Sequence, residues 1–203
     1  MASSVFDHNN PFWQWLASMV DIVGLSLCWL LCSLPLLTVG AATAALYDGV
    51  YHGLRRGKGG VYPRFFKTFV RELGPATLLS LPFAGVWLVC GGLFEVTRTM
   101  AAAGNGVAAV LVWAYGLLFS LPLGGWLFTM ALLSRFVLPT GRLLATALRV
   151  ALSHLPMLLL LSLLAMAAVR LMAWWYISLT FLPAVTALVA SLFFEPVFRP
   201  YLD

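Results

Sequence analysis

The chain has 203 residues, of which 62% are hydrophobic and only 9% are charged. A soluble domain carries about 25% charged residues, so this composition excludes an ordinary soluble protein and predicts an all-α integral membrane protein with one transmembrane helical domain over residues 1–203. The net charge of +5 comes from basic residues beside apolar segments, so we expect contact with the lipid bilayer and its anionic headgroups, and no nucleic acid partner.

Five apolar segments are long enough to cross a hydrocarbon layer of about 30 Å as helices. We expect these five spans at about residues 15–34, 76–96, 107–133, 152–171 and 175–194. Residues 1–11 contain no Lys or Arg, so they lack the basic region of a signal peptide and are expected to remain in the mature protein. The three cysteines lie in apolar segments and are expected to be small packing residues.

The basic residues gather between the spans, and ten of the twelve fall in three stretches. These are Arg55, Arg56, Lys58, Arg64, Lys67 and Arg71, then Arg135, Arg142 and Arg149, and finally Arg199. Basic residues beside spans tend to remain in the cytoplasm. We therefore predict a multi-pass membrane protein with its N-terminus outside, its C-terminus cytoplasmic, and a cytoplasmic basic surface on the first two stretches.

The segment after the first span carries small residues at every fourth position: Ala41, Ala45, Gly49, Gly53 and Gly57. Such a ridge lets another helix approach closely. We interpret residues 41–56 as a short helix packed at the cytoplasmic border, with a re-entrant segment as the alternative.

Residues 63–73 have the pattern of an amphipathic helix that lies along the inner membrane surface, with apolar Phe65, Phe66, Phe69 and Val70. The spacing Arg64, Thr68, Arg71 recurs as Arg142, Thr146, Arg149. The recurrence indicates either a parallel repeat of spans one and two as spans three and four, or two cytoplasmic elbows of similar design.

Asp21 is the one acidic residue that lies clearly inside a predicted span. An unpaired carboxylate at that depth would cost several kcal/mol, so we expect it to be held by Arg170 or Arg98 as an intramembrane polar pair. The functional alternative is a contact with a proton or a substrate.

The sequence lacks the motifs on which most catalytic sites depend. It has no phosphate-binding loop with Lys, no His-Glu-x-x-His and no Gly-x-Ser-x-Gly. His8, His52 and His154 do not share a metal-ligand spacing. We therefore expect a protein that is not an enzyme, with no catalytic residues, no metal site and no cofactor.

The run from Asp21 to Tyr47, with Trp29, the Pro35-Leu-Leu-Thr38-Val-Gly40 turn and the Leu46-Tyr47 pair, resembles the signature of the YesL-like family of bacterial membrane proteins. The later Phe65-Phe66-Lys67-Thr68-Phe69 and the second basic elbow are similar to that family too. Its members form a domain of unknown function (number 624) and are often encoded beside sugar-binding proteins and permeases.

This resemblance implies a protein of the bacterial cell (inner) membrane that is a non-catalytic accessory or assembly component of a carbohydrate uptake system. Its partners would be importer permease subunits, or the protein would associate with itself. The alternative is a small autonomous membrane transporter or channel, and an intramembrane enzyme ranks third.

Overall fold

The computed structural model describes residues 11–57, 60–136 and 139–198, and every element within these ranges is helical. The helices are α1 (Pro11–Cys32), α2 (Val39–Gly49), α3 (Val61–Ala102), α4 (Gly106–Arg135), α5 (Thr140–Ser153), α6 (Leu155–Trp174) and α7 (Leu182–Phe198). Three short segments connect them, namely the 3-10 turns η1 (Leu36–Thr38) and η3 (Tyr176–Thr180) and the π-helical η2 (Val50–Arg55).

Four of the described helices are long and apolar enough to cross a membrane: α1 from Trp15 onward, α3, α4 and α6. They overlap the first four predicted spans and support a multi-pass membrane protein. Helix α7 is apolar but has only 17 residues. It begins at Leu182 and not at residue 175, because residues 176–180 form η3 and the chain turns there.

Helix α2 is buried between α1 and α3 and runs antiparallel to both. Trp29 Nε1 of α1 donates to Thr43 Oγ1 of α2 over 3.1 Å, whereas Gly49, further along α2, meets Leu25, which is earlier in α1. Ala41 and Ala45 are fully buried. Residues 41–51 thus lie in the core and not at the border of the bundle, because their small side chains let helices pack on several sides.

Helix α3 is continuous from Val61 to Ala102, so the amphipathic helix expected at residues 63–73 is its first turns and not a separate element. Pro75 lies inside α3, where it removes one backbone donor without ending the helix. The residues expected on one apolar side of this segment do not share one environment. Phe65 is fully buried, whereas Phe66 and Val70 are 48% and 67% exposed.

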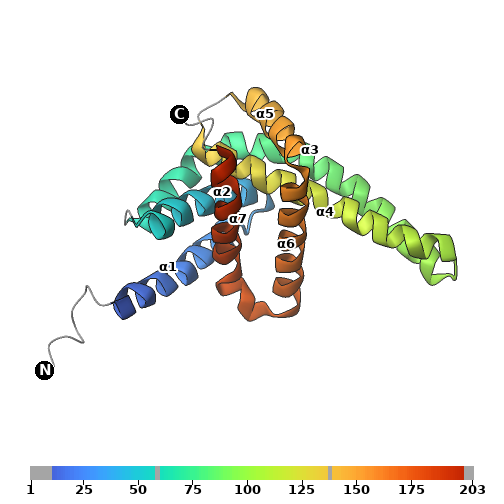
Figure 1. The fold of residues 1–203 in the computed structure, drawn as a ribbon, viewed down its shortest axis with the longest axis horizontal. Coiled ribbons are helices and arrows are strands. Elements are labelled where there is room, and N and C mark those ends of the chain that lie inside the picture. Colours follow the sequence, from blue (N-terminus) through green and yellow to red (C-terminus); the bar gives the residue numbers. More distant parts are fainter. Residues whose placement is uncertain (1–10, 58–59, 137–138, 199–203) are drawn as a thin grey trace, which may run out of the picture.

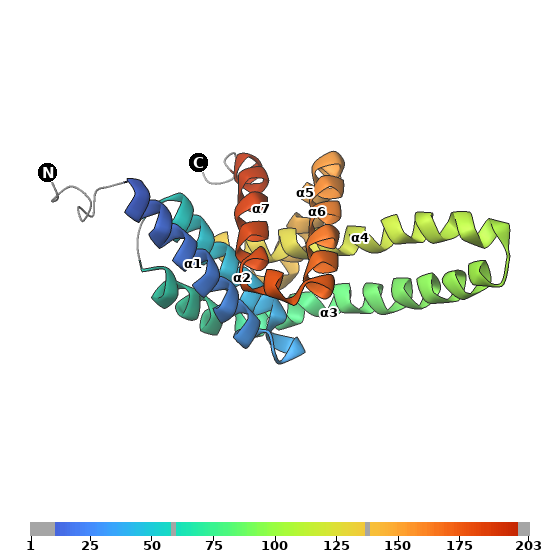
Figure 2. The same ribbon diagram turned by 90° about the horizontal axis from the view of Figure 1, so that it is seen from below.

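Helices α3 and α4 form a long hairpin that projects beyond the other helices (Figures 1 and 2). At its tip Gly104 adopts a φ of +91°, and the Asn105 side chain caps α4 by accepting from the backbone N–H of Val107 and Ala108. Large apolar side chains cover its outer surface, including Leu88 (79% exposed) and Trp113 (83% exposed). Such a surface suits lipid.

Helices α6 and α7 form a second hairpin, which crosses the α3–α4 hairpin at a steep angle in both views (Figures 1 and 2). The crossing requires Gly124 of α4, because a Cβ there would lie 2.8 Å from Ser162 Oγ and 3.1 Å from the Leu158 carbonyl oxygen of α6. The expected parallel repeat is not confirmed. The connection from α1 to α3 contains the buried α2 and continues directly into α3, whereas the connection from α4 to α6 contains the separate helix α5.

Candidate functional site: a buried polar network beside a basic pocket

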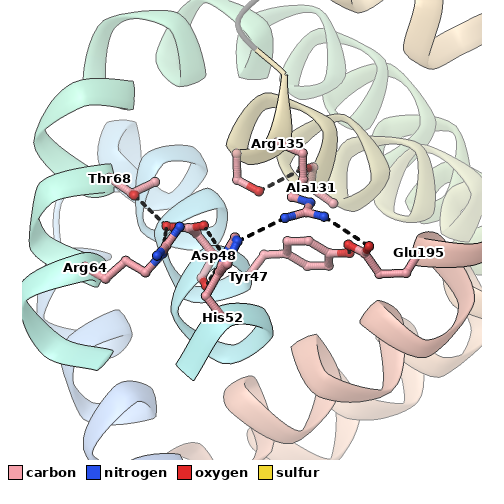
Figure 3. A network of polar contacts seen from close by, with 9 residues as sticks. Tyr47, Asp48, His52, Arg64, Thr68, Ala131, Arg135 and Glu195 are labelled. Atoms are coloured by element: carbon pink, nitrogen blue, oxygen red, sulfur yellow. Dashed lines mark hydrogen bonds and ion pairs between the residues drawn. The ribbon is translucent and has the colours of Figure 1, made fainter. Parts of the chain in front are cut away.

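A network of charged side chains joins four parts of the fold where α2, α3, α4 and α7 meet (Figure 3). Its first half centres on Asp48 of α2, which is 3% exposed. The Asp48 carboxylate accepts from Arg64 Nε over 3.0 Å and from Thr68 Oγ1 over 2.8 Å, both on α3. Its other oxygen lies 2.8 Å from His52 Nδ1.

The second half of the network centres on Arg135, at the end of α4. Arg135 Nη1 lies 3.2 Å from His52 Nε2, and Arg135 Nη2 donates to Glu195 Oε2 of α7 over 3.1 Å. Tyr47 of α2 donates its hydroxyl to the other oxygen of Glu195. Both charged side chains are less than 10% exposed. The network therefore ties the last helix to α2 and α4.

The geometry fixes the protonation state of His52. Arg135 can only donate, so Nε2 of His52 accepts and the ring proton sits on Nδ1, where it faces Asp48. Burial lowers the pKa of His52, and the adjacent Asp48 carboxylate opposes that shift. Both ring nitrogens are occupied, so His52 is not available as a general base.

The π-helical turn η2 shapes this region. Its wider ring is closed by a hydrogen bond from Arg56 N–H to the Tyr51 carbonyl, five residues earlier. The turn places Tyr51 under the Arg135 guanidinium, whose central carbon lies 4.0 Å from the ring centroid. This cation–π contact stabilises a guanidinium that has little access to water.

A pocket of about 490 Å³ opens beside the network. Four cationic side chains line it: Arg64, Lys67 and Arg71 from α3, and Arg135 from α4. Three of them form ion pairs, namely Arg64–Asp48, Arg71–Glu72 and Arg135–Glu195. Lys67 has no ion pair among the described residues, so the site with its neutral histidine carries a surplus of one positive charge.

The structure does not bring Asp21 and Arg98 together. The Tyr62 hydroxyl, at the start of α3, hydrogen-bonds Asp21. Arg98 lies near the far end of α3, about 54 Å from Tyr62 along the helix at 1.5 Å per residue. It pairs with Glu95. Arg170 is exposed on α6, and the ion pairs within the described ranges include neither it nor Asp21.

The small-residue ridge faces other helices of the same chain. A Cβ at Gly49 would lie 3.3 Å from Leu25 of α1, and a Cβ at Gly53 would lie 2.6 Å from Val61 of α3. Gly57, the last of the ridge, is instead a turn residue with φ of +60°.

The expected cytoplasmic basic surface is divided between two places. Arg64, Lys67 and Arg71 line the pocket, whereas Arg142 and Arg149 are exposed on α5. Arg55 donates to the Ser191 carbonyl of α7, Arg56 lies over the Tyr51 ring, and Lys58 lies outside the described residues.

Sequence reasoning missed Glu195 and the meeting of Asp48 with Arg64. The sequence does contain a signal for them, because Asp48 and Glu195 both stand among apolar residues, where a carboxylate needs a partner. Within the described ranges, no group of three His, Cys, Asp or Glu side chains is placed to hold a metal ion.

Residues 22–91 match the family model described as "Protein of unknown function, DUF624", a segment that runs from α1 through α2 and the pocket-lining turns of α3. No curated protein and no solved structure matches the chain. Over residues 22–91 the match confirms the resemblance to the YesL-like family, DUF624, that was drawn from the sequence.

Proposed function

We propose that this protein is a non-catalytic, multi-pass membrane protein that serves as an accessory or assembly component of a bacterial carbohydrate uptake system. One observation carries the non-catalytic part: the buried side chains of the network are used for bonds within the chain. In the network, His52 has both ring nitrogens occupied, and Arg135 and Glu195 hold each other. The carbohydrate part rests on the family resemblance, because members are often encoded beside sugar-binding proteins and permeases.

The hydroxyl groups inside the long helices support the accessory role over an autonomous transporter or channel. Ser80, Thr97 and Thr129 each donate to the carbonyl four residues earlier in the same helix, over 2.7–2.8 Å. Hydroxyls bonded in this way are satisfied by their own helix. A sugar pathway needs hydrogen-bonding side chains that face a shared space at membrane depth.

For the membrane arrangement we propose five crossings by α1, α3, α4, α6 and α7 in the bacterial inner membrane. The 17 residues of α7 extend about 25 Å, which is near the lower limit for a crossing. Following the distribution of basic residues, the two elbows and the C-terminus face the cytoplasm and the N-terminus faces outward.

Cysteine labelling in intact cells tests this orientation, with the native cysteines replaced. Cysteines introduced at Ser4 and Ala103 should react with an impermeant thiol reagent, whereas one at Ala145 should react only after lysis. Ala103 follows α3 at the tip of the hairpin and Ala145 is exposed on α5. If Ser4 is protected while Ala103 is labelled, the N-terminus does not face outward. The chain would then have to cross the membrane twice before α3, and α2 would be the further crossing.

Copurification tests the accessory role. The tagged full-length protein is solubilised from native membranes in mild detergent, and associated proteins are identified by mass spectrometry. Mixing with isotopically labelled membranes from untagged cells separates complexes formed in the cell from those formed after lysis. We expect permease subunits of a sugar importer. Recovery of the protein alone, together with substrate flux in liposomes that contain only this protein, would replace the proposal with the transporter alternative.

A further inference from the structure

The pocket beside the network holds more hydrogen-bond donors than the chain itself uses. Arg64 is bound to Asp48 through Nε, and Arg71 is bound to Glu72 through Nε. These ion pairs fix each guanidinium while they leave its terminal nitrogens for other partners. The two side chains are 39% and 51% exposed, so a ligand can reach them.

Lys67 stands between these two arginines on the same helix face. Positions 64, 67 and 71 follow the i, i+3, i+7 spacing that aligns side chains along one side of a helix. Lys67 lines the pocket, is exposed, and has no ion pair among the described residues. It supplies the positive charge that the carboxylates of the site leave unneutralised.

Arg135 provides an independent observation at the inner wall of the pocket. Its side chain is 8% exposed, and its Nε–H is buried without a hydrogen-bond partner. A buried donor without a partner is unfavourable, because it has lost its hydrogen bonds to water. The terminal nitrogens of Arg135 are directed to His52 and Glu195 and its Nε is itself buried, so Arg135 contributes a fixed positive charge to the inner wall of the pocket.

We propose that this pocket, formed by α2 and η2, the first turns of α3 and the end of α4, binds a phosphate group. Cationic side chains from two helices surround the space, and a phosphate offers three or more acceptor oxygens where a carboxylate offers two. The volume of about 490 Å³ falls within the range of roughly 300–1,000 Å³ typical of small-molecule sites. The phosphate belongs either to an anionic lipid headgroup or to a soluble phosphorylated molecule.

The roles of the side chains follow from their burial. Arg135 and Thr68 form the buried floor, with Thr68 holding Asp48 in place. Arg64, Lys67 and Arg71 form the accessible rim that contacts the phosphate oxygens. Asp48 and Glu72 lie behind this rim and orient the two arginines through their Nε atoms.

Binding of inorganic phosphate to the purified full-length protein in detergent tests the proposal. Titration calorimetry is run against acetate at equal ionic strength, with Lys67→Gln as the test variant and Arg142→Gln as its control. Both changes remove one exposed positive charge, but Arg142 lies on α5, away from the pocket lining. Loss of one charge-assisted bond should weaken phosphate binding about 10-fold or more in Lys67→Gln. Arg142→Gln should change it less than about 2-fold, since a remote exposed charge is largely screened.

Two further arms identify the source of the phosphate. Phosphatidylglycerol in nanodiscs should prevent binding of inorganic phosphate if a headgroup occupies the site, whereas phosphatidylcholine nanodiscs serve as the reference. A hexose phosphate that binds more tightly than inorganic phosphate in phosphatidylglycerol nanodiscs would identify a soluble ligand. Either result supports the site.

Three outcomes would overturn it: no saturable binding of any phosphate probe, equal binding of acetate, or equal losses in Lys67→Gln and Arg142→Gln. Lys67→Arg separates a binding defect from a folding defect, because it keeps the charge. It should retain phosphate binding within about 3-fold, given that arginine also serves as a phosphate donor.

Discussion

The ion pair between Arg135 and Glu195 should be the most sensitive polar contact in the protein. The two side chains are 8% and 7% exposed, and their Nη2 and Oε2 atoms are 3.1 Å apart. Glu195→Ala leaves the Arg135 guanidinium buried without its carboxylate. Breaking a buried pair in this way costs about 3–5 kcal/mol of the free energy of unfolding.

Unfolding in mixed micelles of dodecyl maltoside and SDS, followed by tryptophan fluorescence, measures this loss. The matched control is Glu95→Ala, which breaks the same type of pair with Arg98 at the tip of the hairpin. There the two side chains are 62% and 56% exposed, so the loss should be about 0–1 kcal/mol.

A double-mutant cycle completes the argument. Arg135→Met with Glu195→Ala removes both charges and should recover part of the loss, with a coupling energy of about 1–3 kcal/mol. Equal losses for Glu195→Ala and Glu95→Ala, or strict additivity in the cycle, would refute the reasoning that burial makes this pair important.

Gly49→Leu should lower the free energy of unfolding by about 1–3 kcal/mol, because its Cβ would meet Leu25, whereas Gly92→Leu, with open space at Cβ, should not. Because folding lowers the pKa of His52, the imidazole is protonated in the unfolded chain at a higher pH than in the folded protein. Protonation therefore favours the unfolded state, and the free energy of unfolding should decline as the pH drops below about 6.5. His52→Gln should flatten the curve of unfolding free energy against pH. Tyr51→Leu should cost about 1–2 kcal/mol in the same unfolding assay through the lost cation–π contact, while Tyr51→Phe should keep most of it.

The four long apolar helices could be predicted from the sequence because an uninterrupted apolar run of sufficient length has one stable form in lipid. Helix α6 illustrates this, since its 20 residues lie close to the segment expected from hydrophobicity. The start of α3 is harder to predict from the sequence. Gly74 and Pro75 have the pattern of a helix boundary, but packing against α2 keeps the helix continuous through them.

The network was beyond prediction from a single sequence, because its members lie far apart in the chain. Arg135 and His52 are separated by 83 residues, and Tyr47 and Glu195 by 148. Asp48 and His52 lie between the small residues of this segment, yet no local pattern identifies the helix that they face. The pocket likewise depends on the end of α4 meeting the first turns of α3, which only the tertiary packing determines.

The position of Glu195 on the last helix also sets an order of events during synthesis. Arg135 is made 60 residues before its carboxylate partner. At about 5–20 residues per second, this interval lasts roughly 3–12 s, during which the guanidinium has no Glu195 to meet. We therefore expect α7 to dock last and to withdraw Arg135 from water as it does so. Ribosome-bound chains halted after α6 should leave the Arg135 position accessible to a water-soluble probe, and release of the finished chain should close it.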